Sequence, residues 1–300
     1  MKNDRYWQIQ FIASGGFATV YKAIDGFSGR VVALKELKNP TPDNVRRFRR
    51  ESDMLTTHLN NPFVVNILGS DLACAAPYIV LEYSELGSLQ KYVADRRDWR
   101  RISGWLRDIS YGLTIIHERR EFIRDIKPSN LLRFRDANGS ELVKIADFGL
   151  GQRPDNPSGP MTASPFGTEG YIDPIARINQ NFTSASDVYS LGITARELLT
   201  GSRDLRNQIP GPPEFQALIS SMTYSDPNWR PTARQIFEQI ESIRQSPAPL
   251  TAPDSGGQGL WWLLAGAAAA IAVAANANSW DGRSRRYRDS GGRFRSGWFS

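Results

Sequence analysis

The most constraining feature of this sequence is a pair of short polar segments near its middle. The run Ile-Arg-Asp-Ile-Lys-Pro-Ser-Asn at 123–130 places a carboxylate, an ammonium and an amide, those of Asp125, Lys127 and Asn130, in one tight loop. Asp147 opens the second segment, Asp-Phe-Gly, 22 residues after Asp125 and directly behind the strand-like run Leu-Val-Lys-Ile-Ala. Each segment alone is common by chance, whereas the two in this order are highly specific.

Two charged residues earlier in the chain extend this pattern. Lys35 ends the apolar run Val-Ala-Leu-Lys and can act as a point charge toward phosphate, although a lysine at a strand end is usually solvated. Glu51 follows sixteen residues later in an amphipathic segment, from which it can pair with Lys35 and orient it. Together with the two polar segments, these residues supply what phosphoryl transfer needs: a carboxylate to orient a hydroxyl, a cation on the γ-phosphate and oxygen ligands for Mg²⁺.

The apolar periodicity predicts a small β-rich region followed by a larger helical one. Residues 6–36 read as an antiparallel meander of short strands with glycine turns at 15–16 and 26–29, although most such turns are only turns. Helical spacing follows at 43–59, with Asp43 as N-cap, and two more strands are expected around 64–69 and 77–83. Beyond residue 87 we expect helices at 88–96, 102–120, 185–199, 213–223 and 232–244. The expected fold class is α+β.

Charge and cysteine content exclude several functional classes. The net charge is +6, and residues 281–300 alone hold six Arg and two Asp, so most of the excess lies in the last twenty residues. A general nucleic-acid coat, which would be basic throughout, is therefore excluded. The single cysteine, Cys74, excludes an intramolecular disulfide framework and a zinc site built on several thiolates. It fits a reducing compartment.

The C-terminal quarter has a different character. Residues 246–259 are rich in Pro, Gly, Ser and Ala and predict a flexible linker. Residues 260–277 carry no charge and are flanked by tryptophans, which predicts a transmembrane or interfacial helix, because about 18 residues is near the lower limit for crossing a bilayer. A soluble helix packed on the helical region and an unstructured segment are the alternatives. Residues 278–300 form a basic low-complexity tail.

The orientation of this C-terminal segment stays open. A single membrane span that follows a cytosolic domain would place the Arg-rich tail on the non-cytosolic side of the membrane. The positive-inside tendency of membrane proteins favours the cytosolic side for such a tail. A helix that lies in the interface, with the tail on anionic lipid, avoids this conflict.

The motifs together resemble those of the eukaryotic-type (Hanks-type) serine/threonine protein kinase family, over about residues 6–244. The loop Asp-Ile-Lys-Pro-Ser-Asn is similar to the serine/threonine form, not to the tyrosine-kinase form. The resemblance implies the bilobal protein-kinase fold, with a kinase domain at 1–245 divided into an N-lobe at about 1–82 and a C-lobe at about 83–245. It further implies a cytoplasmic enzyme with protein substrates that carry Ser or Thr, and ATP and Mg²⁺ as cofactors, with Mn²⁺ as an alternative metal.

Catalytic roles follow from the resemblance, residue by residue. Asp125 would be the catalytic base, Lys127 would stabilise the γ-phosphate, and Asn130 and Asp147 would hold Mg²⁺. Lys35, paired with Glu51, would bind the α- and β-phosphates. Thr168, in the stretch Gly-Thr-Glu-Gly-Tyr, would bridge Asp125 and Lys127 and position the substrate.

The nucleotide itself would contact three groups of residues. Leu81 matches the gatekeeper, and the backbone groups of Glu82 and Ser84 would meet adenine. The residues that would cover the phosphates or sandwich the ring are Ala13, Ser14, Gly15, Gly16, Ala18, Val20, Ala33 and Leu132. Asp187 matches the residue of a buried helix that anchors the catalytic loop.

The sequence departs from the family pattern at several positions. Of the three loop glycines only Gly15 is kept, since Ala13 and Ala18 replace the others, and we expect weaker ATP binding or slower turnover because the added methyls hinder close approach. Ile123 replaces a histidine that stacks under Phe148 in the family. Isoleucine can fill that volume, in a stack with Ile67, Leu55 and Phe148, but cannot form a hydrogen bond.

Two further positions bear on the activation segment. Ile175 replaces the family's glutamate partner of Arg230, and because a buried unpaired guanidinium is costly, we expect Arg230 to pair with Asp173, another acceptor or solvent. Arg124 is retained and can bind a phosphate on the segment, for which Thr162 and Ser164 are candidates. The alternative is that these two are ordinary loop hydroxyls.

Two other functions remain open. The altered glycine loop, Ile123 and Ile175 are compatible with a membrane-attached, pseudokinase-like scaffold that binds nucleotide or partners without turnover. The intact Lys35 and Asp125 argue against it. Arginines and aromatics of the tail could instead stack on nucleic acid, but a solvated or lipid-facing tail is favoured and nucleic acid is not expected as a partner.

Overall fold

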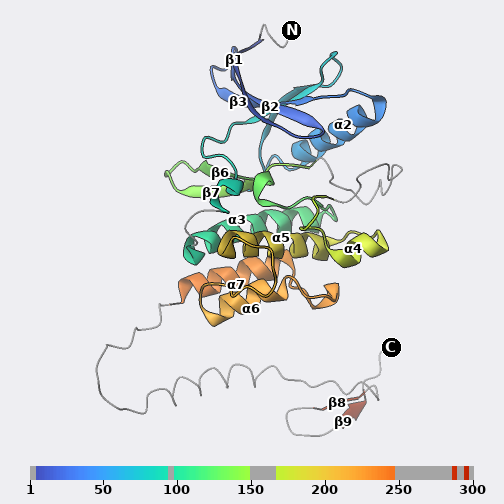
Figure 1. Ribbon diagram of the computed structural model, residues 1–300, viewed down its shortest axis with the longest axis vertical. Coiled ribbons are helices and arrows are strands. Elements are labelled where there is room, and N and C mark those ends of the chain that lie inside the picture. The colour runs from blue at the N-terminus through green and yellow to red at the C-terminus, as the bar shows by residue number, and fades with distance from the viewer. Residues whose placement is uncertain (1–4, 94–97, 149–166, 247–285, 289–293, 297–300) are drawn as a thin grey trace, which may run out of the picture. The chain divides into compact units, whose positions relative to one another are not determined.

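The computed structural model describes residues 5–93, 98–148, 167–246, 286–288 and 294–296. Residues 1–247 form one compact unit and residues 248–300 form a second. Within the first unit, a sheet and one long helix come first in the sequence and a set of helices follows. The two groups lie at opposite ends of this unit (Figure 1). This arrangement confirms the predicted α+β, bilobal fold.

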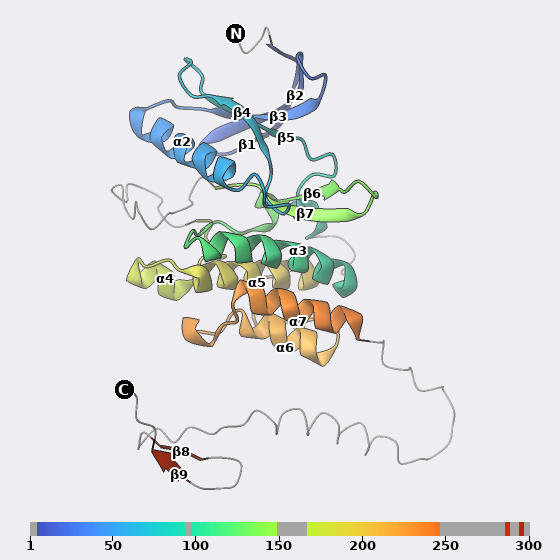
Figure 2. The same cartoon turned by 180° about the vertical axis from the view of Figure 1, so that it is seen from behind.

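The N-terminal lobe is a five-stranded antiparallel sheet in the order β1-β2-β3-β5-β4. The strands are β1 (Tyr6–Ser14), β2 (Ala18–Asp25), β3 (Val31–Leu37), β4 (Ile67–Asp71) and β5 (Tyr78–Glu82). The first three form the expected meander. Helix α2 (Pro42–Thr57) packs against this sheet (Figure 2) and begins at Thr41, whose side chain accepts a hydrogen bond from the N–H of Asn44.

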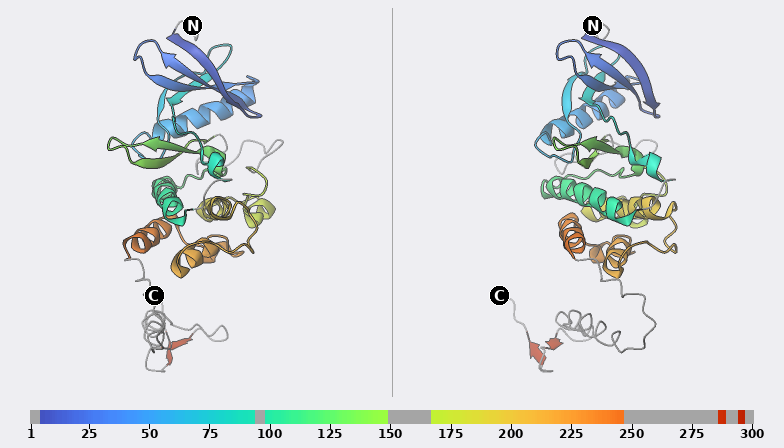
Figure 3. Two further views of the ribbon diagram at one scale, coloured as in Figure 1. Left: turned by 60° about the vertical axis from the view of Figure 1, so that its left-hand side comes forward. Right: turned by 90° about the vertical axis from the view of Figure 1, so that its left-hand side faces the viewer.

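The C-terminal lobe is built around helix α3 (Trp99–Glu118), which lies between the β6–β7 hairpin and α7 (Figure 3). The other elements are η1 (Leu89–Tyr92), η2 (Pro128–Asn130), β6 (Leu131–Arg135), β7 (Glu141–Ile145), α4 (Pro174–Asn179), α5 (Ser184–Thr200), α6 (Pro213–Ser221), η3 (Pro227–Trp229) and α7 (Ala233–Gln245). One hydrophobic core runs through both lobes and includes Phe48 of α2, Leu113 of α3 and Leu191 of α5.

Three sequence predictions about local structure were wrong. The N-cap of α2 is Thr41 instead of the expected Asp43, which lies in the first turn of the helix. The helix expected at 88–96 is only the short 3₁₀ turn η1 in the described residues, because Ser88 is extended and forms a bridge with Leu132. The strand expected at 64–69 begins at Ile67 instead. Val65 lies outside that strand because its N–H donates to the carbonyl of Ile145 in β7, 2.9 Å away.

The second unit contains two short described strands. β8 (Arg286–Arg288) pairs antiparallel with β9 (Phe294–Ser296) inside the basic tail. None of the helices that the structure describes is both long enough and apolar enough to cross a membrane. The segment at 260–277, for which a membrane or interfacial helix was predicted, lies outside the described residues.

Candidate active site

Two carboxylates, one from each lobe, meet at Lys35. Its Nζ lies 2.5 Å from Oε1 of Glu51 on α2 and 3.2 Å from Oδ1 of Asp147, which follows β7. Burial alone would lower the pKa of Lys35, but Asp147 and Glu51 outweigh it and raise that pKa, so the ammonium stays charged. Burial, which Lys35 only partly offsets, raises the pKa of Glu51 to about 7. The pairing of Lys35 with Glu51, predicted from their spacing, is confirmed.

The carboxylate of Asp125 is held by hydrogen bonds on both oxygens. Oδ1 accepts from the backbone N–H of Thr168 at 3.0 Å and from its Oγ1 at 2.9 Å. Oδ2 accepts from Nζ of Lys127 at 2.7 Å and from Nδ2 of Asn130 at 3.0 Å. Oγ1 of Thr168 also bonds to Lys127, so the expected bridge between Asp125 and Lys127 is present. These bonds fix the orientation of the carboxylate.

Asp187 of α5 anchors the loop that carries Asp125. Its carboxylate accepts from the backbone N–H of Ile123 at 2.9 Å and of Arg124 at 2.8 Å. Arg124 has a φ of 68°, a conformation that costs a non-glycine residue about 1 kcal/mol or more, and the two charge-assisted bonds offset this cost. His117, which sequence reasoning left unused, holds Asp187 in turn through a contact of 3.0 Å.

Asn130 and Asp147 form a pair of oxygen donors that fits Mg²⁺. The N–H of Ala146 donates to the carbonyl of Asn130 at 2.9 Å, which places the residue before Asp147 beside the catalytic loop. Both bonds that Asn130 makes to Asp125 use Nδ2, so the amide oxygen is the end turned from Asp125. The described residues contain no cluster of three or more acidic, His or Cys ligands. Mg²⁺ does not need one, because it commonly takes one or two protein ligands together with phosphate oxygens and water.

The residues predicted to surround adenine lie on neighbouring strands. Val20 of β2 is opposite Lys35, and Ala33 of β3 is opposite Leu81 of β5. Val20 and Leu132 of β6 are partly buried against the core that contains Ala33 and Leu81. These four apolar side chains therefore belong to one cluster.

The segment that joins the lobes is fixed by polar contacts. The N–H of Glu82 donates to the carbonyl of Asn66 at 3.0 Å, and its side chain accepts from Lys144 at 2.6 Å. The hydroxyl of Ser84 donates to the carbonyl of Arg133 at 2.6 Å. The side chains of Glu82 and Ser84 are thus used to fix the segment between the lobes. The adenine contacts predicted for these two residues involve their backbone groups.

The glycine turn between β1 and β2 is closed by a hydrogen bond of 2.9 Å from the N–H of Gly15 to the carbonyl of Ala18. Nζ of Lys38 donates to the carbonyl of Gly15 at 2.5 Å, a contact that the sequence did not suggest. Ser14 at the end of β1 pairs with Thr19 of β2, and Gly16 follows in the turn. The predicted phosphate loop is therefore tied to the residue that follows β3.

Arg230 pairs with Asp173, the first of the partners expected for it, and the residues of the expected apolar stack share one buried cluster. Leu55, Phe148 and Ile123 are each at most 1% exposed and lie in the same core cluster, with Ile67 packed against it. Arg230 binds Asp173 through two hydrogen bonds, of 2.6 and 3.0 Å.

Arg124 has a half-buried guanidinium. It lies over the ring of Phe182, 4.7 Å from the ring centroid, and burial lowers its pKa even though Asp187 acts in the opposite direction. Thr162 and Ser164, the predicted phosphate carriers, lie outside the described residues.

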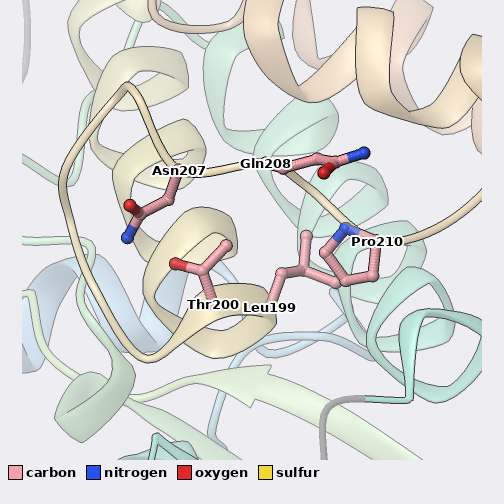
Figure 4. Close-up of a pocket in the computed structure, with 5 residues that line it drawn as sticks. All are labelled: Leu199, Thr200, Asn207, Gln208 and Pro210. Atoms are coloured by element: carbon pink, nitrogen blue, oxygen red, sulfur yellow. The ribbon is translucent and has the colours of Figure 1, made fainter.

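A hollow of about 390 Å³ lies elsewhere in the C-terminal lobe (Figure 4). Leu199 and Thr200 at the end of α5 line it together with Asn207, Gln208 and Pro210 of the following loop. None of the predicted site residues takes part in it.

Comparison with known proteins agrees with this geometry. The protein kinase domain model matches residues 6–240. The serine/threonine-protein kinase PrkC of Bacillus subtilis is 31% identical over 248 residues, which cover 79% of this chain and 37% of PrkC. A probable serine/threonine-protein kinase, pknA2, of Bifidobacterium longum is 33% identical over 210 residues, covering 67% of this chain and 27% of that protein. The cytokinesis protein sepH of Aspergillus niger is 29% identical over 259 residues, covering 78% and 19%.

The chain spans less than two fifths of the length of each of these relatives. The family model nevertheless covers both lobes and every described polar residue of the site. The chain therefore belongs to the protein kinase domain family, and it is similar to eukaryotic-type (Hanks-type) serine/threonine members of that family.

Proposed function

We propose that this chain transfers the γ-phosphate of ATP to serine or threonine hydroxyls of protein substrates. The observation that carries the proposal is the fixed carboxylate of Asp125, which two residues of its own loop and Thr168 hold in one orientation. A carboxylate fixed in this way can accept a hydroxyl proton as the oxygen attacks phosphorus.

Each remaining charged group has a role in the same step. Lys127, 2.7 Å from Asp125, would neutralise charge on the transferred phosphoryl group, and Lys35 would hold the α- and β-phosphates. Asn130 and Asp147 would hold Mg²⁺, which when bound neutralises phosphate charge. The apolar cluster of Val20, Ala33, Leu81 and Leu132 would take the adenine ring, with the backbones of Glu82 and Ser84 at its edge.

The decisive experiment compares the wild type with Asp125→Asn. Purified protein, labelled ATP, Mg²⁺ or Mn²⁺ and a generic protein substrate should give phosphoserine or phosphothreonine with the wild type only, while both proteins melt at similar temperatures. Full activity of the variant would exclude Asp125 as the base. A phosphoproteome comparison of cells that carry either form would then identify substrates.

A pseudokinase-like scaffold is the second candidate. Ala13 and Ala18 in the phosphate loop and Ile123 in the stack are the observations that favour it. Nucleotide binding without any phosphate transfer by the wild type would support the scaffold and contradict the kinase proposal.

Regulation and location are further parts of the proposal. Phosphate on Thr162 or Ser164 would bind Arg124, so phosphatase treatment should lower activity in the wild type but not in a Thr162→Ala/Ser164→Ala variant.

Attachment of a cytoplasmic kinase domain to membrane lipid rests on the sequence of 260–277 and of the basic tail. The double variant Ala268→Asp/Ile271→Asp should shift the full chain from the membrane fraction to the soluble fraction. Equal fractionation of wild type and variant would contradict this anchor.

A further inference from the structure

The ring of Phe148 has a histidine neighbour that does not come from the catalytic loop. His58, the C-cap residue of α2, stacks on Phe148 with ring centroids 5.9 Å apart and an angle of 29° between the planes. Ile123, on the loop side of the same cluster, offers only apolar contact. The end of α2 therefore supplies a polar side chain next to Phe148.

His58 also reaches the segment that leads into the catalytic loop. Its Nε2 lies 2.6 Å from Oε2 of Glu121, and the two residues are only 2% and 5% exposed. Glu121 directly precedes that loop, two residues before Ile123 and four before Asp125. A short polar contact between two buried groups thus links the end of α2 to the start of the loop.

The backbone of His58 fixes the other end of this link. Its N–H donates to the carbonyls of Met54 and Leu55 at 3.1 and 3.2 Å, so the imidazole moves with the last turn of α2. The same helix carries Leu55 into the apolar stack and Glu51 to Lys35. A shift of α2 would therefore strain the contact with Glu121 and the pair with Lys35 together.

We infer that His58 is a positioning residue, which with Glu121 couples α2 to the catalytic loop and seats Phe148 so that Asp147 stays aligned with Lys35. This inference rests on the proposed kinase function. The contact takes over the polar link that Ile123 cannot form.

The physical basis is the difference between polar and apolar contact. A buried hydrogen bond is directional, and separating its partners leaves desolvated polar groups unsatisfied. An apolar contact of similar size tolerates sliding, because dispersion attraction depends little on direction. His58 and Glu121 should therefore restrict the relative movement of α2 and the loop more than two leucines would.

The test compares four full-length proteins: wild type, His58→Leu, Glu121→Leu and the double leucine variant. Each single variant leaves one buried polar group without this contact, so both should lose stability. The double variant removes both groups and should melt close to the wild type. Its kcat should nevertheless fall by about tenfold, with KM for ATP changed by less than about threefold, because the directional link is lost.

Hydrogen exchange supplies a second readout, independent of activity. Amides of residues 121–125 should exchange faster in the double variant. Leu59→Ala, at the exposed neighbour of His58, is the matched control and should change neither kcat nor exchange. A folded double variant with wild-type kcat, or with unchanged exchange at 121–125, would overturn the inference. A wild type that phosphorylates nothing would overturn the proposed function instead, and exchange alone would then decide whether His58 positions the loop.

Discussion

Arg230 and Asp173 form a two-point ion pair in which neither side chain is more than 1% exposed. Nη1 lies 2.6 Å from Oδ2 and Nη2 lies 3.0 Å from Oδ1, while Nε donates to the carbonyl of Tyr224 at 2.8 Å. Asp173 also caps α4, since Oδ1 accepts from the N–H of Ile175 at 3.0 Å. The pair therefore joins the start of α4 to the loop before α7.

Removing one partner of this pair should be costly. Asp173→Asn would leave a buried guanidinium without its counter-charge, and we expect the free energy of unfolding to fall by about 3–5 kcal/mol. Urea denaturation measures this. The matched control is Asp204→Asn, because Asp204 binds Arg206 with similar geometry on an exposed surface, where the change should be small. Equal losses in the two variants would contradict the argument from burial.

We expect the titration of the Glu51 carboxyl to change activity and stability in opposite directions as the pH varies. Burial raises its pKa from an ordinary value of 4.5 to about 7, so its contribution to stability is full below pH 4.5 and is lost as the pH rises through 7. Activity should change the other way. Ionised Glu51 orients Lys35, and protonation below pH 7 leaves Lys35 drawn toward Asp147, 3.2 Å away.

The measurement is kcat/KM for ATP between pH 5.5 and 8.5. The wild-type profile should rise with a midpoint near 7, whereas Glu51→Gln should be slow and lack that step, because the amide does not titrate. The same midpoint in Glu51→Gln would assign the titration to another group.

The parts of the site that were predictable from sequence are those fixed by spacing along the chain. Lys35 and Glu51 meet because a strand and the following helix bring them together, and Asp125, Lys127 and Asn130 share one loop. These relationships depend on local geometry, which residue identity and separation largely determine.

Some contacts of buried polar groups with partners distant in sequence were not predictable. His58 and His117 were assigned no role from the sequence, yet each contacts a carboxylate distant in sequence. Helical periodicity shows which face is apolar but not where a polar side chain near a helix end finds a partner. For the same reason η1 was expected to be a longer helix: the bridge from Ser88, its N-cap residue, to Leu132 depends on the strand β6, which the sequence pattern did not reveal.

Thr168 offers a test of how strongly the orientation of Asp125 matters. Thr168→Val keeps the shape and the backbone N–H but removes the hydroxyl that bonds to Asp125 and Lys127. Because hydrogen bonds to charged groups contribute about 2 kcal/mol, kcat should fall by about thirtyfold. Thr168→Ser restores the hydroxyl and should stay near the wild type. A valine variant as active as the serine variant would show that Lys127, Asn130 and the backbone N–H of residue 168 suffice to orient Asp125.

The alanines of the phosphate loop should respond differently to glycine, because they differ in burial. Ala13 is exposed on β1 opposite Val20, whereas Ala18 is 6% exposed and pairs with Leu37 of β3. Ala13→Gly removes a methyl beside the phosphates and should lower KM for ATP, with a stability cost of about 0.5–1 kcal/mol from added backbone freedom.

Ala18→Gly is the matched comparison, since it also removes a buried apolar contact and should lower the melting temperature more. Steady-state kinetics and thermal unfolding of both variants separate the two effects. An unchanged KM in Ala13→Gly would mean that the turn, held by Lys38 on the Gly15 carbonyl, limits approach to phosphate more than the methyl does.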